Sequence, residues 1–153
     1  MGKRTIEEEL ERQQQCVFQT VGDSMEPLLH SRKSTVVIEK PQVALKKYDV
    51  VLYRRPAGEY VLHRIVKVRA RDYLICGDNR IYAESVPGEW ILGVMTGVYP
   101  DESGRFLSCQ DAAYRKYLQW IPVRYAVRWM KALPGRICRK LAKRKNLDRA
   151  RDL

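Results

Sequence analysis

The sequence predicts a mainly β fold with a short N-terminal helix and a basic helical segment at its C-terminal end. Before residue 110, short runs of β-branched and aromatic residues alternate with clusters of turn residues, as is typical of antiparallel sheets. After about residue 112, the apolar residues recur at helical spacing instead. The chain has 153 residues, of which 45% are hydrophobic, so we expect one domain with an appendage.

The first expected element is a helix over residues 6–14. Thr5 and Glu8 have the spacing of a capping box, and three acidic residues, 7–9, lie in the first turn, where the helix dipole favours them. This N-terminal stretch has no apolar core of a secretory signal, and no run approaches the roughly 18 consecutive apolar residues of a membrane-spanning helix. We therefore expect a cytoplasmic protein.

Six runs are expected to form strands. They are CVFQTV, STVVIEK, DVVLYRR, YVLHRIVKV, DYLICG and WILGVMTGVY. The turn clusters GDS, PAGE, GDN, VPGE and DESG fall in the remainder of this part of the chain. Residues 53–64 have the pattern of a β-hairpin whose turn is 56–59.

Helical periodicity begins at about residue 112. One apolar stripe follows the spacing of a helix face, and its members are Tyr114, Tyr117, Leu118, Ile121, Tyr125 and Trp129. Pro122 suits the first turn of a second helix, LPG at 133–135 ends it, and a third helix is expected over 136–145.

The positive charge of the chain belongs to this C-terminal part. Residues 111–153 contain 13 Lys and Arg against 3 Asp and Glu, whereas the charges of residues 1–110 nearly cancel. We accordingly expect a β module over 1–110 and a basic amphipathic tail over 111–153. Two interpretations of the tail stay open: it packs on the β module with a solvated basic face, or it binds an anionic membrane surface or, less favoured, nucleic acid.

Metal and cofactor chemistry is not expected. The four cysteines, Cys16, Cys76, Cys109 and Cys138, lie far apart, and the chain has only two histidines. No C-x-x-C pair or other ligand spacing is present, so we expect reduced thiols and no bound metal or cofactor.

Three short stretches carry the candidate catalytic residues. Ser24 lies in GDSMEP, His63 lies between apolar neighbours in VLHRI, and Asp78 lies in a GDN turn with Glu84 six residues later. Each stretch alone is ordinary: GDSMEP has turn composition, and a histidine on an apolar face is more often a core residue than a base. A serine hydroxyl is also a poor nucleophile without an adjacent base.

Together and in this order, the three stretches resemble the signal peptidase clan, which includes type I signal peptidases and the self-cleaving LexA-like repressors. The resemblance covers roughly residues 17–98. It implies a signal-peptidase-like catalytic β module in which Ser24 is the nucleophile and His63 the general base, as in the endoplasmic-reticulum and archaeal type. Glu84 or Asp78 would orient the histidine, and the glutamate at 84 departs from the aspartate usual there.

The same resemblance implies that a peptide substrate lies extended beside a β-strand, with small side chains in shallow pockets. Met25 and an expected edge strand at 34–39, with Val36 and Val37, are the candidate substrate-binding residues. Only 23 residues precede Ser24, too few for the DNA-binding domain of a repressor, and hydropathy indicates no membrane anchor.

We therefore expect a stand-alone serine endopeptidase, cytoplasmic or peripheral at the inner membrane surface, whose partner is a peptide or protein substrate. One alternative is a catalytically degenerate member that binds peptides without cutting them. Another is an adaptor that uses the basic C-terminal helices on a membrane or on nucleic acid.

Overall fold

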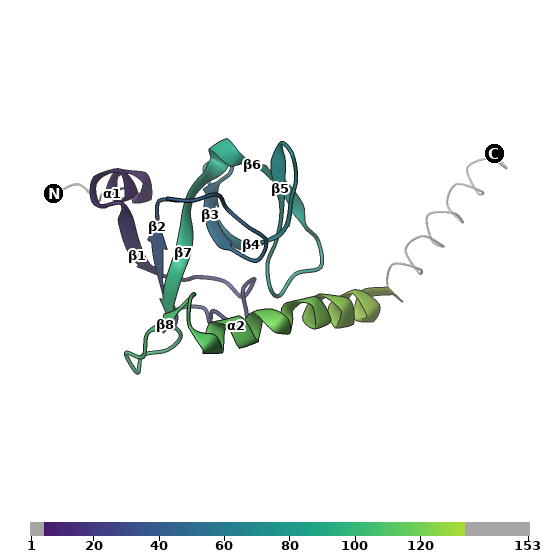
Figure 1. The fold of residues 1–153 in the computed structure, drawn as a ribbon. Coiled ribbons are helices and arrows are strands. Elements are labelled where there is room, and N and C mark those ends of the chain that lie inside the picture. Colours follow the sequence, from purple (N-terminus) through teal and green to yellow (C-terminus); the bar gives the residue numbers. More distant parts are fainter. Residues whose placement is uncertain (1–4, 134–153) are drawn as a thin grey trace, which may run out of the picture.

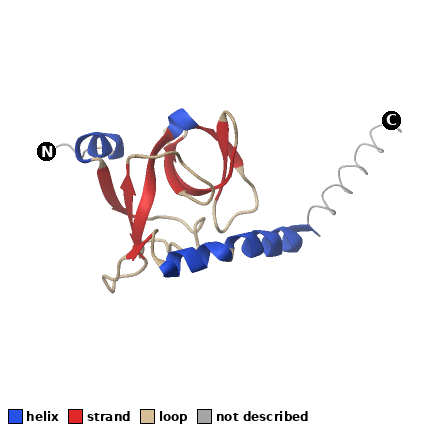
Figure 2. Ribbon diagram, in the orientation of Figure 1, coloured by secondary structure: helices blue, strands red, loops and turns tan. Residues whose placement is uncertain are grey.

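The computed structural model describes residues 5–133, which form one antiparallel sheet with helices at both ends of this range (Figures 1 and 2). The elements are α1 (Ile6–Gln13), β1 (Gln15–Gln19), β2 (Thr35–Glu39), β3 (Val50–Arg54), β4 (Tyr60–Val68), β5 (Asp72–Cys76), β6 (Glu84–Pro87), the 3-10 helix η1 (Gly88–Trp90), β7 (Ile91–Tyr99), β8 (Leu107–Ser108) and α2 (Ala112–Gln119). Residues 121–133 are helical as well. The third helix expected over 136–145 lies outside the described residues.

The strand order is β1-β2-β7-β3-β4-β5-β6, and β8 pairs with β7. The predicted mainly β class, with a helix before and a helix after the sheet, is confirmed, and all six predicted runs contain strands. Two strands, β6 and β8, were not predicted; they are four and two residues long. In the described part of the chain, no helix combines the length and the apolar character needed to cross a bilayer.

The predicted helix cap and hairpin are both present. Thr5 Oγ1 accepts from the Glu8 N–H at 3.3 Å, and the Glu8 carboxylate accepts from the Thr5 N–H at 3.0 Å, which is the reciprocal pair of a capping box. Between β3 and β4, the chain reverses at 56–59, where Gly58 adopts φ +94, a conformation that favours glycine. This hairpin fixes the register of β4, on which His63 lies.

β3 lies inside the sheet, and its side chains from Val50 to Tyr53 are buried on both faces. Val50 and Leu52 belong to a core that also contains residues of α1, β2 and α2. Val51 and Tyr53 belong to a second core formed with Ile65, Ile75 and Val86. In Figure 1, β3, β4, β5 and β6 curl round, so that this half of the sheet wraps over the second core.

One strand position differs from the prediction. The segment at 34–39 was expected to be an edge strand, but β2 lies between β1 and β7, and Val17 of β1 is paired with Val37. The prediction was wrong because edge position depends on which distant strand pairs on each side, and local composition does not encode this. The edge on this side of the sheet is β1.

The C-terminal helix packs on the β module over its first turns. Tyr114 is 3% exposed within the first core, and Ile121 is 1% exposed. Tyr114 and Ile121 thus attach this helix to the β module, and its other side stays exposed, as in the first of the two interpretations of the tail.

Candidate active site

Ser24 lies in the loop between β1 and β2, and that loop is joined to the turn after β5. The Ser24 carbonyl accepts from the Asn79 N–H at 2.7 Å, and the Asn79 side chain donates to the Asp23 carbonyl at 3.1 Å. Arg80 pairs with the Asp23 carboxylate at 2.6 Å. Next to the serine, Met25 is 4% exposed, and its sulfur accepts from the Asp78 N–H at 3.5 Å. Contacts on both sides therefore hold the serine in place.

Gly77 brings the Ser24 loop close to His63. A Cβ added at Gly77 would lie 2.6 Å from the Ser24 carbonyl oxygen and 3.1 Å from Nε2 of His63. Only a residue without a side chain allows both groups to approach this point. Within residues 5–133, the N–H and Oγ of Ser24 have no hydrogen-bond partner, so Ser24 and His63 are neighbours without a direct hydrogen bond.

The other ring nitrogen of His63 faces Tyr53. Nδ1 lies 3.4 Å from the Tyr53 hydroxyl, and that hydroxyl donates its proton to Glu84 Oε1. Because the Tyr53 proton is directed at Glu84, the Tyr53 oxygen accepts from Nδ1–H. This assigns the neutral tautomer that carries its lone pair on Nε2, the nitrogen beside Gly77 and the Ser24 loop.

Glu84 is held in turn by an arginine. Arg55 donates to both oxygens of Glu84, at 2.6 Å and 3.2 Å. Burial raises the pKa of Glu84, but the hydrogen bonds from Arg55 and Tyr53 outweigh burial and bring this pKa below its usual range. Burial also raises the pKa of Tyr53, and Glu84 adds to the effect. At neutral pH, Glu84 is ionised and Tyr53 keeps its proton.

Burial lowers the pKa of His63 to about 4. Glu84 opposes this effect, while the positive charges of Arg55 and Arg80 add to it. The imidazole is therefore neutral at neutral pH and can accept a proton. The site thus contains an ionised acid, a tyrosine, a neutral histidine and a serine, in that order in space.

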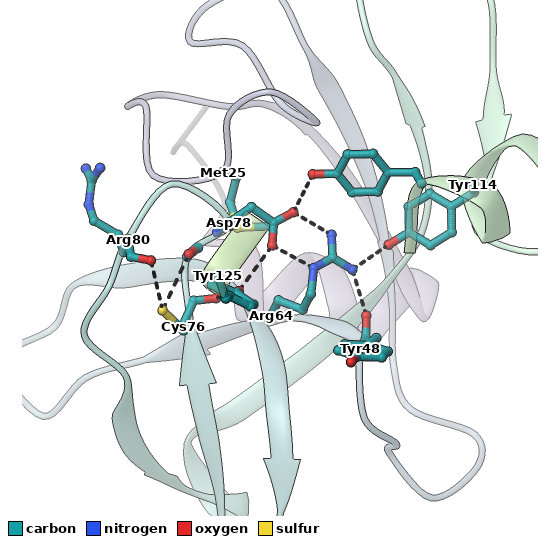
Figure 3. A network of polar contacts seen from close by, with 10 residues as sticks. Met25, Tyr48, Arg64, Cys76, Asp78, Arg80, Tyr114 and Tyr125 are labelled. Carbon is teal, nitrogen blue, oxygen red and sulfur yellow. Dashed lines mark hydrogen bonds and ion pairs between the residues drawn. The ribbon is translucent and has the colours of Figure 1, made fainter. Parts of the chain in front are cut away.

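Asp78 has a different environment. It is 1% exposed, and its two oxygens accept from Nε and Nη2 of the fully buried Arg64, each at 2.7 Å. Tyr117 donates to the same carboxylate at 2.9 Å, and Arg64 also donates to the Tyr48 carbonyl and the Tyr114 hydroxyl. Figure 3 shows this network, in which Asp78 faces Arg64 and the tyrosines of the C-terminal helix. Of the two candidate acids, Glu84 is linked to His63, and Asp78 forms no hydrogen bond with it.

An apolar groove of about 270 Å³ adjoins Ser24. Its lining residues are Ile6, Phe18, Gln19, Thr20, Val21, Gly22, Ser24, Met25, Leu29, Leu52, Tyr60, Val61 and Leu62. Those from β1 belong to an edge strand, and those from β4 belong to its first half, which pairs only with β3 because pairing with β5 begins at Arg64. The groove therefore lies beside two strand segments, β1 and the first half of β4, each of which has one unpaired edge.

Of the predicted substrate-binding residues, Met25 lines this groove, and Val36 and Val37 do not. Both valines are buried within β2, in the interior of the sheet. Tyr53 and Arg55 were not predicted to be site residues. The signal was available in the hairpin: Tyr53 pairs with Val61, two residues before His63 on the same face, and such diagonal neighbours are within reach of an aromatic side chain.

Comparisons of this chain with protein-family models, with curated proteins and with solved structures found no match. Inferences about function therefore rest on the residues and on the geometry described above.

Proposed function

We propose that this chain is a serine endopeptidase of the signal-peptidase type, with Ser24 as nucleophile and His63 as general base. The observation that carries the proposal is the position of Nε2 of His63, which lies against Gly77 together with the Ser24 main chain. A nucleophile next to an unprotonated imidazole nitrogen, whose other nitrogen is oriented by a third group, is the general arrangement of serine catalysis.

In the proposed reaction, Nε2 takes the Ser24 proton as Oγ attacks the substrate carbonyl, and His63 then returns the proton to the leaving amine. A positioned acid–base group of this kind contributes about 10²–10⁴-fold. The Ser24 N–H has no partner among the described residues and is available to the oxyanion. Water then hydrolyses the acyl-enzyme with the same histidine as base.

Tyr53 and Glu84 would act as positioning residues. The Tyr53 oxygen holds Nδ1–H, which keeps the lone pair on Nε2, and Glu84 fixes the direction of the Tyr53 hydroxyl. The negative charge of Glu84 favours the imidazolium that forms during proton transfer. This relay would replace the direct carboxylate–histidine contact that the resemblance implied.

The proposed substrate is an extended peptide in the groove beside Ser24. The unpaired edges of β1 and of the first half of β4 can bond its main chain by strand addition. The apolar lining, with Phe18, Met25 and Leu62 among its residues, would take one or two apolar side chains.

The alternative proposal is a module that binds peptides in this groove without cutting them. It is favoured by one observation: the Ser24 hydroxyl makes no hydrogen bond to His63 in the described structure.

The test is to incubate the full chain with a mixed proteome-derived peptide library and to identify new peptide ends by mass spectrometry. Ser24→Ala and His63→Ala are expected to abolish the new ends while leaving the thermal midpoint nearly unchanged. Ser103→Ala and His30→Ala are the matched controls, because both residues are exposed and distant in sequence from the site residue of the same type. Cleavage by Ser24→Ala at the wild-type rate would exclude Ser24 as the nucleophile, and wild-type binding without cleavage would favour the alternative.

A further inference from the structure

The helical segment that follows α2 exposes large apolar side chains to solvent. Trp120 is 57% exposed and Met130 is 56% exposed, with Val123 and Val127 between them at 48% and 38%. Their spacings of three and four residues place them on one side of a helix. We call these four residues the outer face.

The opposite side of the same segment contacts the β module. Ile121 is buried, and the Tyr125 hydroxyl donates to the Cys76 carbonyl at 3.4 Å and lies 3.5 Å from Asp78. Because Ile121 and Tyr125 orient the segment, the outer face points away from the core. A contiguous exposed apolar surface of this kind usually marks an interaction site.

The charges beside the outer face have one sign. Arg124 and Lys131 follow Trp120 and Val127 by four residues, so they lie next to them on the helix surface. Residues 112–147 contain eleven Lys and Arg and no Asp or Glu. A partner for this surface must therefore accept aliphatic and indole groups and must also carry negative charge.

We infer that the outer face docks on an anionic lipid bilayer, with the helix lying in the plane of the interface. Buried aliphatic side chains and flanking cations are the two features by which amphipathic helices bind such surfaces. A second copy of this chain would bring two unbalanced clusters of cations together. Nucleic acid would use the indole and the cations but offers no apolar environment for Val127 and Met130. The inference is independent of the proposed peptidase activity.

The experiment is co-sedimentation of the full chain with phosphatidylcholine vesicles and with mixed phosphatidylcholine–phosphatidylglycerol vesicles across a salt series. We expect binding to the mixed vesicles at low salt, weaker binding at high salt, and little binding to phosphatidylcholine alone. Val127→Asp is expected to weaken partitioning at least about tenfold, because it loses apolar burial and places an anion at the lipid surface.

Val43→Asp is the matched control. Val43 is 81% exposed and lies in the segment between β2 and β3, so this variant has the same net charge as Val127→Asp without altering the outer face. It should bind nearly as the wild type does. Far-UV circular dichroism checks the helix, and Trp120→Gln tests the same face if Val127→Asp disturbs folding.

Three results would overturn the inference. Wild-type protein could stay in the supernatant with the mixed vesicles at low salt. The two aspartate variants could lose binding equally, which would leave net charge alone as the cause. Sedimentation velocity could show self-association that Val127→Asp abolishes in a protein that ignores lipid, which would make a second copy the occupant.

Discussion

His63 is a histidine whose surroundings keep it neutral. Its pKa of about 4 results first from burial, with Arg55 and Arg80 contributing in the same direction. Tyr53 contacts the ring and adds no charge. The negative charge is on Glu84, which bonds the Tyr53 hydroxyl and does not bond His63 directly. A base with such a low pKa is fully deprotonated at neutral pH, and it is a weaker proton acceptor than an ordinary histidine.

Burial of His63 makes the stability of the protein depend on pH. The pKa of His63 is about 4 in the folded chain and 6.5 in the unfolded chain, so the unfolded state binds more protons between these values. The contribution of His63 to the unfolding free energy is present above pH 6.5 and is lost as the pH falls toward 4. From pH 7 to pH 5 the wild type should lose about 2 kcal/mol of unfolding free energy through this group.

Urea unfolding at the two pH values measures this loss. His63→Gln removes the titrating group, so its stability should fall less than that of the wild type over the same interval. His30→Gln removes an exposed histidine and should behave as the wild type. An equal fall in His63→Gln and wild type would show that His63 is not held neutral by the fold.

At the scale of elements, one buried ion pair joins three parts of the chain. Arg64 is on β4, Asp78 is in the turn after β5, and Tyr114 and Tyr117 on α2 complete their hydrogen bonds. The turn that contains Asp78 also bonds the Ser24 loop, through Asn79 and Arg80. Through this turn the ion pair supports the Ser24 loop, and within the described residues neither Arg64 nor Asp78 forms a hydrogen bond with His63.

Arg64→Met is expected to cost about 3–5 kcal/mol of unfolding free energy, because it leaves the carboxylate of Asp78 buried without a counter-ion. Arg69→Met is the matched control: Arg69 pairs with Asp72 at the surface, where both side chains are partly exposed, and its loss should cost less than about 1 kcal/mol. Denaturant unfolding of the two variants measures the difference. Equal costs would mean that the buried pair has no special structural role.

The sequence predicted which segments form strands better than it predicted which strands pair with each other. Runs rich in valine, isoleucine and tyrosine have few alternatives to a strand, which is why β1–β5 and β7 were found. β6 was missed because ESVP is short and ends in proline. The edge position of β2 was predicted wrongly, since β1 covers it through long-range pairing.

In the candidate site, too, local motifs were predicted and long-range contacts were not. Motif order alone selected Ser24 and His63, and the structure places the Ser24 main chain and the His63 ring next to each other at Gly77. The sequence left Asp78 and Glu84 as alternative partners of His63. Only the fold shows that the Asp78 carboxylate is hydrogen-bonded to Arg64 instead. Composition alone does not indicate Tyr53, whereas the register of the predicted hairpin, which pairs Tyr53 with Val61, would have placed it near His63.

In the molecule as a whole, one side of the C-terminal helix is buried against the β module and the other side is exposed to solvent. Tyr114 and Ile121 are buried against the β module, whereas Trp120 and Met130 face solvent. The buried part completes the first core and the Arg64–Asp78 network. Trp120 and Met130, in contrast, are more than half exposed and belong to neither of the two cores of the described residues.

Truncation separates these two parts of the helix. A chain of residues 1–133 retains the described residues of both buried cores and should unfold at the same urea midpoint as the full chain. A chain of residues 1–110 loses Tyr114, opens the first core and leaves Arg64 and Asp78 without their tyrosines, so it should lose cooperative unfolding.

Two point variants refine the test within the full chain. Tyr114→Ala should cost about 3–5 kcal/mol, as truncation of a large buried aromatic does, and Trp120→Ala on the exposed side should change stability by roughly 0.5 kcal/mol or less. If the chain of residues 1–110 unfolded cooperatively at the full-length midpoint, the helix would be an appendage and the β module would be complete at residue 110. We expect the opposite, because the fully buried guanidinium of Arg64 would lose the aromatic rings of Tyr114 and Tyr117, which lie within 6 Å of it, and water would reach the ion pair.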